Sequence, residues 1–297
     1  MEIRVLRYFL AVAQEESISR AAEALHITQP TLSRQLMELE EELGTPLLNR
    51  GKKNRRVTLT DAGLLLRKRA KEIVALTDKT LAELQASPDM ISGDIYIGGG
   101  ETDAMRLIAR AAKALQAEYP HIRYHLFSGN GDEVAERLEN GLLDLGVFIE
   151  AANMGQYDYI RLPVRDTWGL LMQKTSPLAQ KETIRPEDLD GIPLIVSRQS
   201  MVPNGLSGWS GRSYESLNII ATYNLIYSAS LMVDEGFGYA LCLDRLVNIT
   251  GESSLCFRPL EPRLEAHLDI AWKKNQVHSK PTEIFLQKLK ETFSGEG

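Results

Sequence analysis

The sequence predicts an α/β protein with three consecutive parts: a small helical N-terminal domain, one long helix and a larger region of alternating strands and helices. Two observations lead to this prediction. Apolar residues recur at helical spacing through roughly the first 86 residues. From residue 94 onward, short strand-like runs alternate with helical stretches. A chain of 297 residues is long enough for two or three domains of ordinary size.

Charge is distributed unevenly along the chain, whose net charge is −6. Residues 1–91 hold 14 Lys and Arg against 13 Asp and Glu, a net of +1, which leaves 20 against 27, a net of −7, for residues 92–297. Within the first part, a run of seven residues contains no acid. Its basic members are Arg50, Lys52, Lys53, Arg55 and Arg56. Because local fields attract phosphate, this run is compatible with nucleic-acid binding by an acidic protein.

Several classes of protein are disfavoured by composition. No apolar run approaches the roughly 20 residues needed to cross a bilayer, and charged residues interrupt any signal-peptide core near the N-terminus. We therefore expect a cytoplasmic protein with no membrane partner. Only two cysteines, Cys242 and Cys256, are present, which excludes a disulfide framework and a cysteine-rich zinc site.

Three short helices are predicted at the start of the chain. The first places Leu6, Phe9, Leu10 and Ala13 on one face. The second is alanine-rich and runs over 20–25 with Ser19 as its N-cap. The third is capped by Thr28, has Pro30 in its first turn and ends at Gly44. Its inward-facing residues are Leu32, Leu36, Leu39 and Leu43.

With these leucines inward, four polar side chains and one proline lie outward near the N-terminus of the third helix. They are Gln29, Pro30, Thr31, Ser33 and Arg34. Gln pairs well with adenine, Arg with guanine, and Ser or Thr with bases or phosphates. A helix-turn-helix requires such an arrangement. From the helices alone, a small bundle without any role in DNA binding is about equally well supported.

The next segment favours DNA binding. Residues 47–50 and 56–58 predict a hairpin whose tip, residues 51–55, is basic. An isolated basic run is best explained as a solvated loop. A basic hairpin directly after a recognition helix is typical of a wing that contacts phosphates or a minor groove. The wing residues are Arg50, Lys52, Lys53, Arg55 and Arg56.

At this point the sequence resembles the LysR-type transcriptional regulators. The matching stretches are RYFLAVAQEESISRAAEALHITQPTLSRQLMELEEELGTPLLNR and RRVTLTDAGLLL. The resemblance implies a winged helix-turn-helix that binds DNA, and a remainder of periplasmic-binding-protein-like fold that senses a small molecule. The family usually has a phenylalanine where this chain has Leu47 and Leu48. We expect that exchange to affect packing more than DNA contact.

A long helix is predicted over about 61–86, with Thr60 as its cap. Its apolar seam is Leu66, Ala70, Ile73, Thr77, Leu81 and Leu84. Such a helix spans roughly 39 Å, too long to bury against one small domain. We expect it to pair with the same helix of a second chain, giving a homodimer on a dyad-symmetric double-stranded operator, and the resemblance favours a homotetramer. The alternative is packing on its own C-terminal domain.

The predicted domains are the winged helix-turn-helix at 1–60, the long helix and a hinge at 61–91, and an effector region of two lobes. The first lobe comprises 92–161 plus 267–297, and the second comprises 162–266. Expected strands and helices of the first lobe are 94–97, 104–119, 122–127, 133–140, 143–149, 267–272 and 282–293. Expected strands of the second lobe are 168–172, 194–196, 218–222 and 239–243.

A ligand cleft is expected where the strands of the two lobes end, because ligands bind at the carboxyl ends of strands in open α/β sheets. Its candidate residues are Gly100, Glu101, Thr102, Ser128, Gly129, Asn130, Glu150, Ser197, Arg198, Gln199, Tyr223 and Asn224. Singly, each is equally well explained by turn chemistry. The resemblance implies that Thr102 holds an anion. Glu101 disfavours a simple acid ligand unless it turns to solvent or pairs with Arg198.

Three alternatives to a ligand-sensing regulator remain. An enzyme is disfavoured because no phosphate-binding, dinucleotide-binding, metalloprotease or serine-hydrolase motif is present, and no cofactor or metal is implied. A redox-sensing regulator would use Cys242 or Cys256. A cytoplasmic solute-binding protein would not need residues 1–91. We expect ligand binding to rearrange the lobes and so to alter DNA bending and contact with RNA polymerase.

Overall fold

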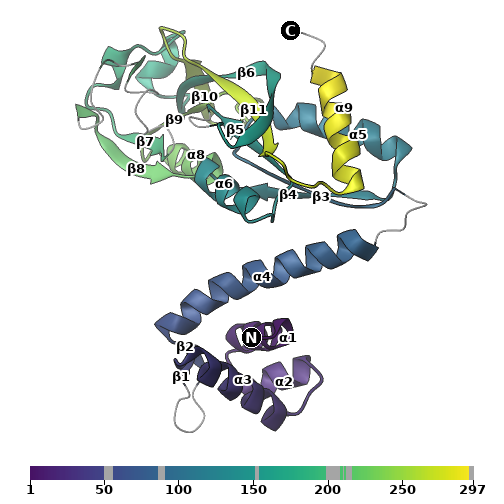
Figure 1. Ribbon diagram of the computed structural model, residues 1–297. Helices are drawn as coiled ribbons and strands as arrows, with labels where there is room; N and C mark the ends of the chain where they lie inside the picture. The colour runs from purple at the N-terminus through teal and green to yellow at the C-terminus, as the bar shows by residue number, and fades with distance from the viewer. Residues whose placement is uncertain are drawn as a thin grey trace. The chain divides into compact units, whose positions relative to one another are not determined.

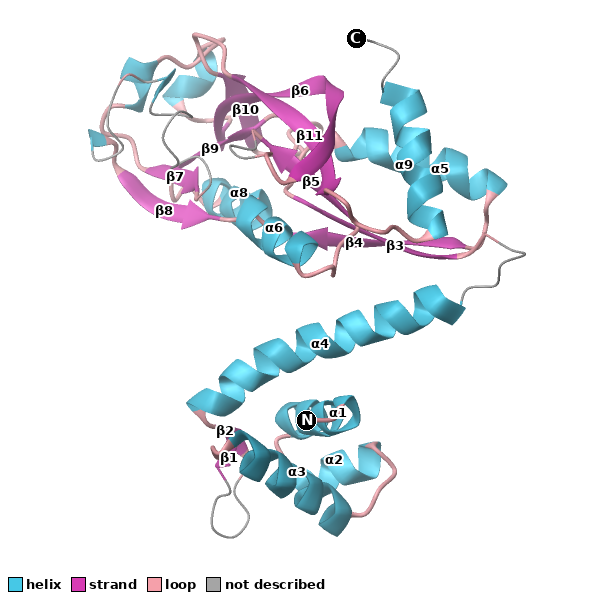
Figure 2. Ribbon diagram, in the orientation of Figure 1, coloured by secondary structure: helices cyan, strands magenta, loops and turns pink. Residues whose placement is uncertain are grey.

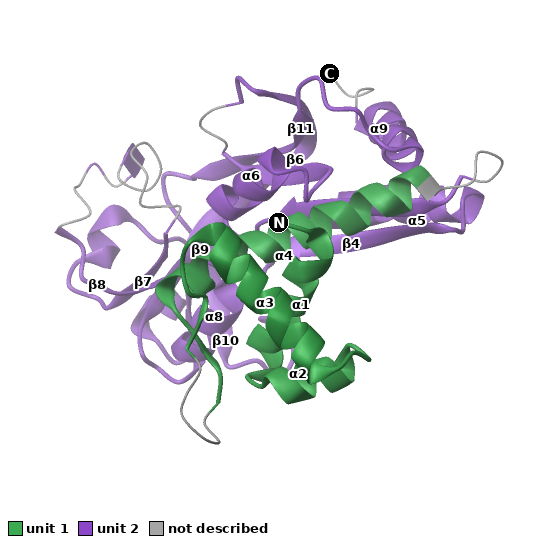
Figure 3. Cartoon of the chain, turned by 60° about the horizontal axis from the view of Figure 1, so that its bottom comes forward, with its two compact units in different colours: residues 1–85 green, residues 86–297 purple. Residues whose placement is uncertain are grey.

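The computed structural model describes residues 1–49, 56–85, 91–150, 154–198, 208–209, 211 and 216–293. Two compact units make up the chain, Met1–Gln85 and Ala86–Gly297, here called the N-terminal and C-terminal units (Figure 3). Within the described ranges, no helix has the length and apolar character that crossing a membrane requires.

The N-terminal unit contains four helices and one short hairpin among its described residues (Figure 1). They are α1 Ile3–Glu15, α2 Ile18–Ala24, α3 Gln29–Leu43, β1 Leu48–Asn49, β2 Thr58–Leu59 and α4 Asp61–Gln85. α1, α2 and α3 pack around one core in which Phe9, Ala21 and Leu32 are fully buried. Small side chains on α2 allow the neighbouring helices to approach closely, as the alanine-rich sequence predicts.

Helix starts follow the expected capping chemistry with one correction. The Thr28 hydroxyl accepts a hydrogen bond from the Thr31 amide, and the Thr60 hydroxyl accepts one from the Gly63 amide, which confirms both caps. The expectation that Ser19 caps α2 is wrong. Ser17, in extended conformation, accepts from the Arg20 amide, and Ser19 lies inside the helix. Both serines suit a cap, but only Ser17 follows the left-handed turn that ends α1 at Glu16.

The buried face of α1 also differs in part from the predicted one. Leu6 and Phe9 are buried as expected, and Val5 and Val12 complete the face. Leu10 and Ala13 are only partly buried.

The described strands of the C-terminal unit form one continuous sheet of nine (Figure 2). They are β3 Gly93–Gly99, β4 Ile122–Ser128, β5 Leu145–Ile149, β6 Tyr157–Gln173, β7 Leu194–Ser197, β8 Ile219–Tyr223, β9 Tyr239–Leu243, β10 Leu255–Pro259 and β11 Glu265–Lys273. Their order is β4-β3-β5-β11-β6-β9-β7-β8, and β10 pairs with β6. β3, β4 and β5 are parallel to one another, as are β7, β8 and β9.

The long strand β6 joins the two halves of this sheet. Its first part pairs with β11 and its last part, from Trp168, pairs with β9 and β10. The strand predicted at 168–172 is therefore too short, because the observed strand begins at Tyr157. β10 is a strand that the sequence analysis did not predict.

Helices cover both faces of the sheet. They are α5 Met105–Glu118, α6 Gly131–Glu139, α8 Ile226–Asp234 and α9 Lys280–Phe293, with short 3₁₀ helices at Pro177–Gln180 and Pro186–Leu189. α5 and α9 lie side by side on one face of the first lobe (Figure 1), over a core that includes Ile108, Leu268 and Phe285. α6 covers the opposite face through Val134 and Leu138.

Gly63 provides a test of how tightly α4 packs on the wing. A methyl group at this position would lie 2.2 Å from the Leu47 carbonyl oxygen. Backbone must therefore shift in Gly63→Ala, and we expect a loss of about 1–3 kcal/mol in unfolding free energy. Denaturant unfolding followed by circular dichroism measures it. Gly208→Ala is the control, because within 4 Å its new methyl group meets no atom of the described residues beyond its chain neighbours. Equal losses in both variants would contradict this packing.

Candidate DNA-binding and ligand-binding sites

The N-terminal part of α3 presents polar side chains to solvent. Leu32, Leu36 and Leu39 are buried on its inner face. The outward residues are mostly exposed, with Ser33 half-buried. They are Gln29, Pro30, Thr31, Ser33 and Arg34. The Nε of Arg34 lies 3.6 Å from Glu38 Oε1, and both side chains are exposed. Such a surface ion pair contributes little, so the guanidinium is easily redirected to another partner.

The hairpin strands pair as predicted. Leu48 pairs with Leu59 and Asn49 with Thr58. Leu47 and Leu48 are buried in the core of the N-terminal unit. The exchange of the family's phenylalanine for leucine at this place therefore lies in the core, where it affects packing. Four predicted wing residues, Arg50, Lys52, Lys53 and Arg55, lie outside the described residues. Arg56 is exposed, and its Nη1 lies 3.2 Å from Glu16 Oε2.

Glu40 anchors the start of the hairpin, a role that sequence analysis missed. Its Oε1 accepts hydrogen bonds from the amides of Leu47 at 2.7 Å and Leu48 at 3.0 Å. Glu40 belongs to an acidic cluster near the end of α3, and nothing in the sequence distinguishes it from its neighbours. This carboxylate therefore fixes the path of the chain from α3 into the hairpin.

The predicted loops of the first lobe lie together at the ends of β3, β4 and β5. The Gly129 amide donates to the Gly99 carbonyl at 3.1 Å, and a side chain on Gly100 would approach the Gly129 carbonyl. Asn130 caps α6, since its Oδ1 accepts from the Glu133 amide at 2.9 Å. The Asn130 side chain thus has a structural role as the N-cap of α6.

Ser128 and Glu150 complete the set from the first lobe. Ser128 is the exposed last residue of β4, opposite Gly99. Glu150 has a left-handed φ of 50° and is tied to the start of β11, where its Oε1 accepts from the His267 amide at 3.3 Å. Its backbone amide also donates to the His267 carbonyl.

The predicted residues of the second lobe follow β7 and β8. Ser197 is buried at the end of β7, and the Arg198 amide donates to the Tyr223 carbonyl at 2.9 Å. The Arg198 side chain is exposed. Gln199 lies outside the described residues.

Tyr223 and Asn224 have internal partners. The Tyr223 hydroxyl donates to the Leu241 carbonyl at 2.7 Å, and burial raises the pKa of this phenol. Asn224 Oδ1 accepts from the Leu225 amide at 3.0 Å, which is ordinary turn chemistry. Because both polar groups bond within the chain, neither of them indicates a ligand site by itself.

Two residues of the predicted set, Glu101 and Thr102, make contacts between the lobes. The Glu101 carboxylate accepts a hydrogen bond from the Ile226 amide, at the N-terminus of α8. Glu101 therefore has a partner other than Arg198, and its expected unfavourable effect on a simple acid ligand stays a prediction. Among the described residues of the second lobe, no side chain caps this helix start. Because helix N-termini favour negative charge, Glu101 supplies the missing cap from the first lobe.

Thr102 continues the junction. Its hydroxyl donates to the buried Asp166 carboxylate and accepts from the Ala104 amide at 3.1 Å. An anion bound by Thr102 would therefore have to displace Asp166. Burial raises the pKa of the Asp166 carboxyl.

Arg245 holds the same junction from the loop after β9. Its guanidinium lies 3.2 Å from Asp103, 3.3 Å from Asp166 and 3.2 Å from Asp244. Arg245 has a φ of 61°, a strained value for a residue with a side chain, and strain of this kind is maintained only by surrounding contacts. These residues lie far apart in the sequence without periodicity, so no sequence pattern could have identified the cluster.

Two family profiles match the chain. The profile described as "Bacterial regulatory helix-turn-helix protein, lysR family" matches residues 3–64, and "LysR substrate binding domain" matches residues 89–294. The chain belongs to the LysR family of transcriptional regulators. It is a DNA-binding regulator with a substrate-binding effector domain, and its family consists of regulators rather than enzymes. LysR regulators bind DNA and small-molecule effectors and form oligomers.

Similar curated proteins are also transcriptional regulators. BsdA of Bacillus subtilis, an HTH-type transcriptional regulator, is 31% identical over 207 residues, which are 69% of this chain and 61% of BsdA. The Hca operon transcriptional activator HcaR of Escherichia coli is 29% identical over 284 residues, 93% of each chain. BudR of Raoultella terrigena is 29% identical over 97% of this chain and 99% of BudR.

Solved structures show the same fold. Full-length CbnR, crystallised with its target DNA, superposes with a TM-score of 0.75 at 20% identity, covering 98% of this chain and 100% of CbnR. CbnR alone gives a TM-score of 0.76 at 19% identity over 99% of both chains. The arrangement of helix-turn-helix, long helix and two-lobed sheet is therefore a LysR-type fold.

Glu101 is expected to stabilise the junction between the lobes. Glu101→Ala leaves the α8 amide without its charged partner, so we expect a loss of about 0.5–2 kcal/mol in unfolding free energy. Denaturant unfolding of the full chain measures this loss. Glu182→Ala removes an exposed acid of the second lobe and is the control. If the two variants are equally stable, Glu101 does not hold α8.

The two thiols provide a test of the redox alternative. Cys242 is buried, and burial raises its pKa to about 12; burial also raises the pKa of Cys256. They belong to different buried clusters on opposite faces of the sheet. Because the thiolate is the reactive form, we expect Cys242 to react with a disulfide reagent at pH 7.5 on the order of a thousandfold more slowly than an exposed cysteine. Rapid loss of both thiols in the folded protein would instead support redox sensing.

Proposed function

We propose that this regulator recognises a dyad-symmetric operator as a dimer, with the N-terminal turns of α3 in the major groove. The observation that carries the proposal is the arrangement of α3 itself. Leu32, Leu36 and Leu39 are buried, whereas Leu43, which was expected to face inward, is exposed at the C-terminal end of the helix. Gln29, Thr31 and Arg34 are exposed at its N-terminal end. Side chains of these types have the hydrogen-bonding groups that base edges require. The basic run from Arg50 to Arg56 would contact the adjoining backbone or minor groove.

The dimer would form through α4. Leu66 and Ala70 of the predicted seam pack toward the core of the N-terminal unit. Leu65, Ile73, Leu76 and Leu84 remain exposed, with spacings of eight, three and eight residues that place them on one helical face. A second copy of α4 would cover this apolar face. A tetramer would pair two such dimers.

The effector domain would bind its ligand between lobes with the proposed boundaries 92–161 plus 267–297 and 162–266, after a DNA-binding domain at 1–60 and a linker at 61–91. The loops after β3, β4 and β5 support this proposal, as do those after β7 and β8. Glu101 already occupies the N-terminus of α8. A simple carboxylate would compete with Glu101, so a neutral or cationic small molecule suits the cleft better.

Ligand binding would act by changing the junction between the lobes. A ligand that separates Glu101 from α8 would alter the spacing of the two DNA-binding domains, and with it DNA bending and contact with RNA polymerase. By linkage, the ligand and the operator must then change each other's affinity by the same factor.

Arg34 provides the direct test of DNA recognition. In a mobility-shift titration on DNA from upstream of the protein's own gene, we expect Arg34→Ala to weaken the specific complex by about 1–3 kcal/mol, roughly 5- to 150-fold. Arg110→Ala removes an exposed arginine from α5, in the effector domain, and is the matched control. Equal affinities of the two variants for the specific complex would contradict the proposed role of α3.

A further inference from the structure

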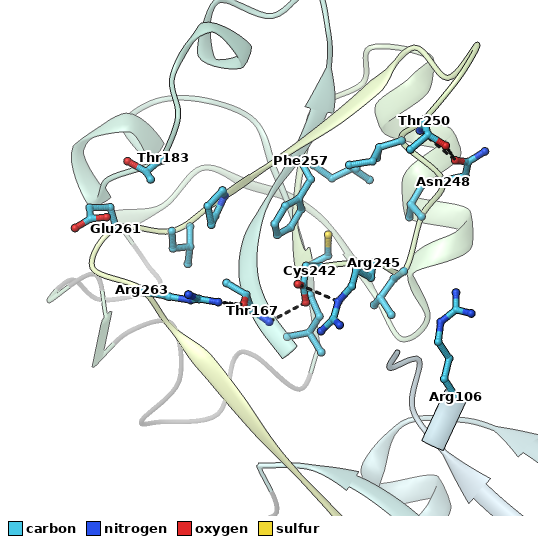
Figure 4. A pocket seen from close by; sticks show the side chains of 18 residues that line it. Arg106, Thr167, Thr183, Cys242, Arg245, Asn248, Thr250, Phe257, Glu261 and Arg263 are labelled. Atoms are coloured by element: carbon cyan, nitrogen blue, oxygen red, sulfur yellow. Dashed lines mark hydrogen bonds and ion pairs between the residues drawn. The ribbon is translucent and has the colours of Figure 1, made fainter. Parts of the chain in front are cut away.

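The C-terminal unit contains a cavity of about 930 Å³ that is separate from the predicted cleft. None of the described candidate cleft residues lines it. Its size falls within the range typical of small-molecule sites, about 300–1,000 Å³. It lies at the second lobe, between the sheet and the loop that follows β9 (Figure 4).

The floor of the cavity is a hollow in one face of the sheet. Thr167 and Leu171 of β6, Cys242 of β9, and Phe257 and Pro259 of β10 line it. Cys242 and Pro259 both pair with Gly169 in neighbouring strands. A methyl group on Gly169 would meet the Phe257 ring at 2.1 Å. The absence of a side chain on β6 at this point therefore creates the space in which the Phe257 ring lies.

The loop after β9 forms the opposite wall. Leu246, Val247 and Ile249 line the cavity, and each is only partly buried. All three also pack against the buried cluster that contains Leu171 and Cys242, so the loop and the sheet together give the cavity apolar walls. An apolar molecule inside the cavity would cover the part of these side chains that the cluster leaves exposed.

Two arginines at the rim already have partners within the chain. Arg245 pairs with Asp103, Asp166 and Asp244. In Figure 4, Arg263 lies at the other side of the cavity from Arg245. It donates to the Thr167 hydroxyl at 3.1 Å and pairs with Glu265 at 3.1 Å. A charged ligand would have to break these pairs, whereas a neutral ligand would leave them intact.

Arg106 and Glu261 are the remaining charged residues of the rim. Arg106 pairs with Asp103 at 2.6 Å, and Glu261 is exposed. The hydroxyls of Thr167, Thr183 and Thr250 provide neutral hydrogen-bonding groups among the lining residues. This composition, apolar walls with a few hydroxyls, matches an uncharged aromatic compound with one hydrogen-bonding group.

We propose that this cavity is a second ligand-binding site, separate from the cleft between the lobes, and that it takes a neutral, mainly apolar ring compound. The probe is indole, and its charged relatives are indole-3-acetate and tryptamine. All three carry the same ring, and the two relatives add a short side chain that ends in a negative or a positive charge.

Isothermal titration calorimetry on the full chain tests the proposal. We expect saturable binding of one indole per chain, and affinities at least tenfold lower for indole-3-acetate and tryptamine. Val247→Trp fills the cavity from the loop and is expected to weaken indole binding at least tenfold. Val277→Trp introduces the same side chain at a position that is 94% exposed, and should leave indole binding unchanged.

Three results would overturn the proposal: no saturable binding of indole, unchanged binding by Val247→Trp, or equal binding of a charged relative. Circular dichroism checks that Val247→Trp is folded. If it is not, Thr250→Trp replaces it, because Thr250 is an exposed residue on the rim and its substitution does not disturb the core. Unchanged binding by that variant would likewise overturn the proposal.

Discussion

Burial of the leucine row on α3 is the constraint on which the proposed mode of DNA recognition depends. Leu32, Leu36 and Leu39 can be buried only on the side that faces α1 and α2. The helical period then directs Arg34 and its polar neighbours outward. Core packing and the proposed DNA-binding surface are thus two consequences of one sequence pattern. Glu40 then fixes the start of the hairpin relative to α3.

In the effector domain, polar contacts between the two lobes have the role that the buried leucines have in the N-terminal unit. β6 runs through both lobes, and Asp166 lies on it where the pairing changes from β11 to β9. Thr102 and Arg245 both bond to Asp166, while Glu101 caps α8. Arg245 also belongs to the loop that covers the cavity of the second lobe. The contacts that join the lobes therefore adjoin both proposed ligand sites.

Elements with a regular pattern could be predicted from the sequence, and contacts between distant residues could not. The periodicity of the leucines and the Thr28 and Thr60 caps located α3 and α4 within a residue or two. The start of β6 was missed because residues 157–161 mix aromatic and charged side chains. The position of Ser17 as a cap depends on the turn at Glu16. The partner of Glu101 is an amide 125 residues away, which no local pattern encodes.

The central claim is that two copies of α3, held by paired α4 helices, read two half-sites of one operator. Selection of bound sequences from random double-stranded DNA with the full chain tests it most directly. The account predicts enriched sites with dyad symmetry, their half-sites separated by about one helical turn, 10–10.5 base pairs, or a multiple of it. A folded, dimeric protein that enriches no sequence, or only sites without symmetry, would contradict it.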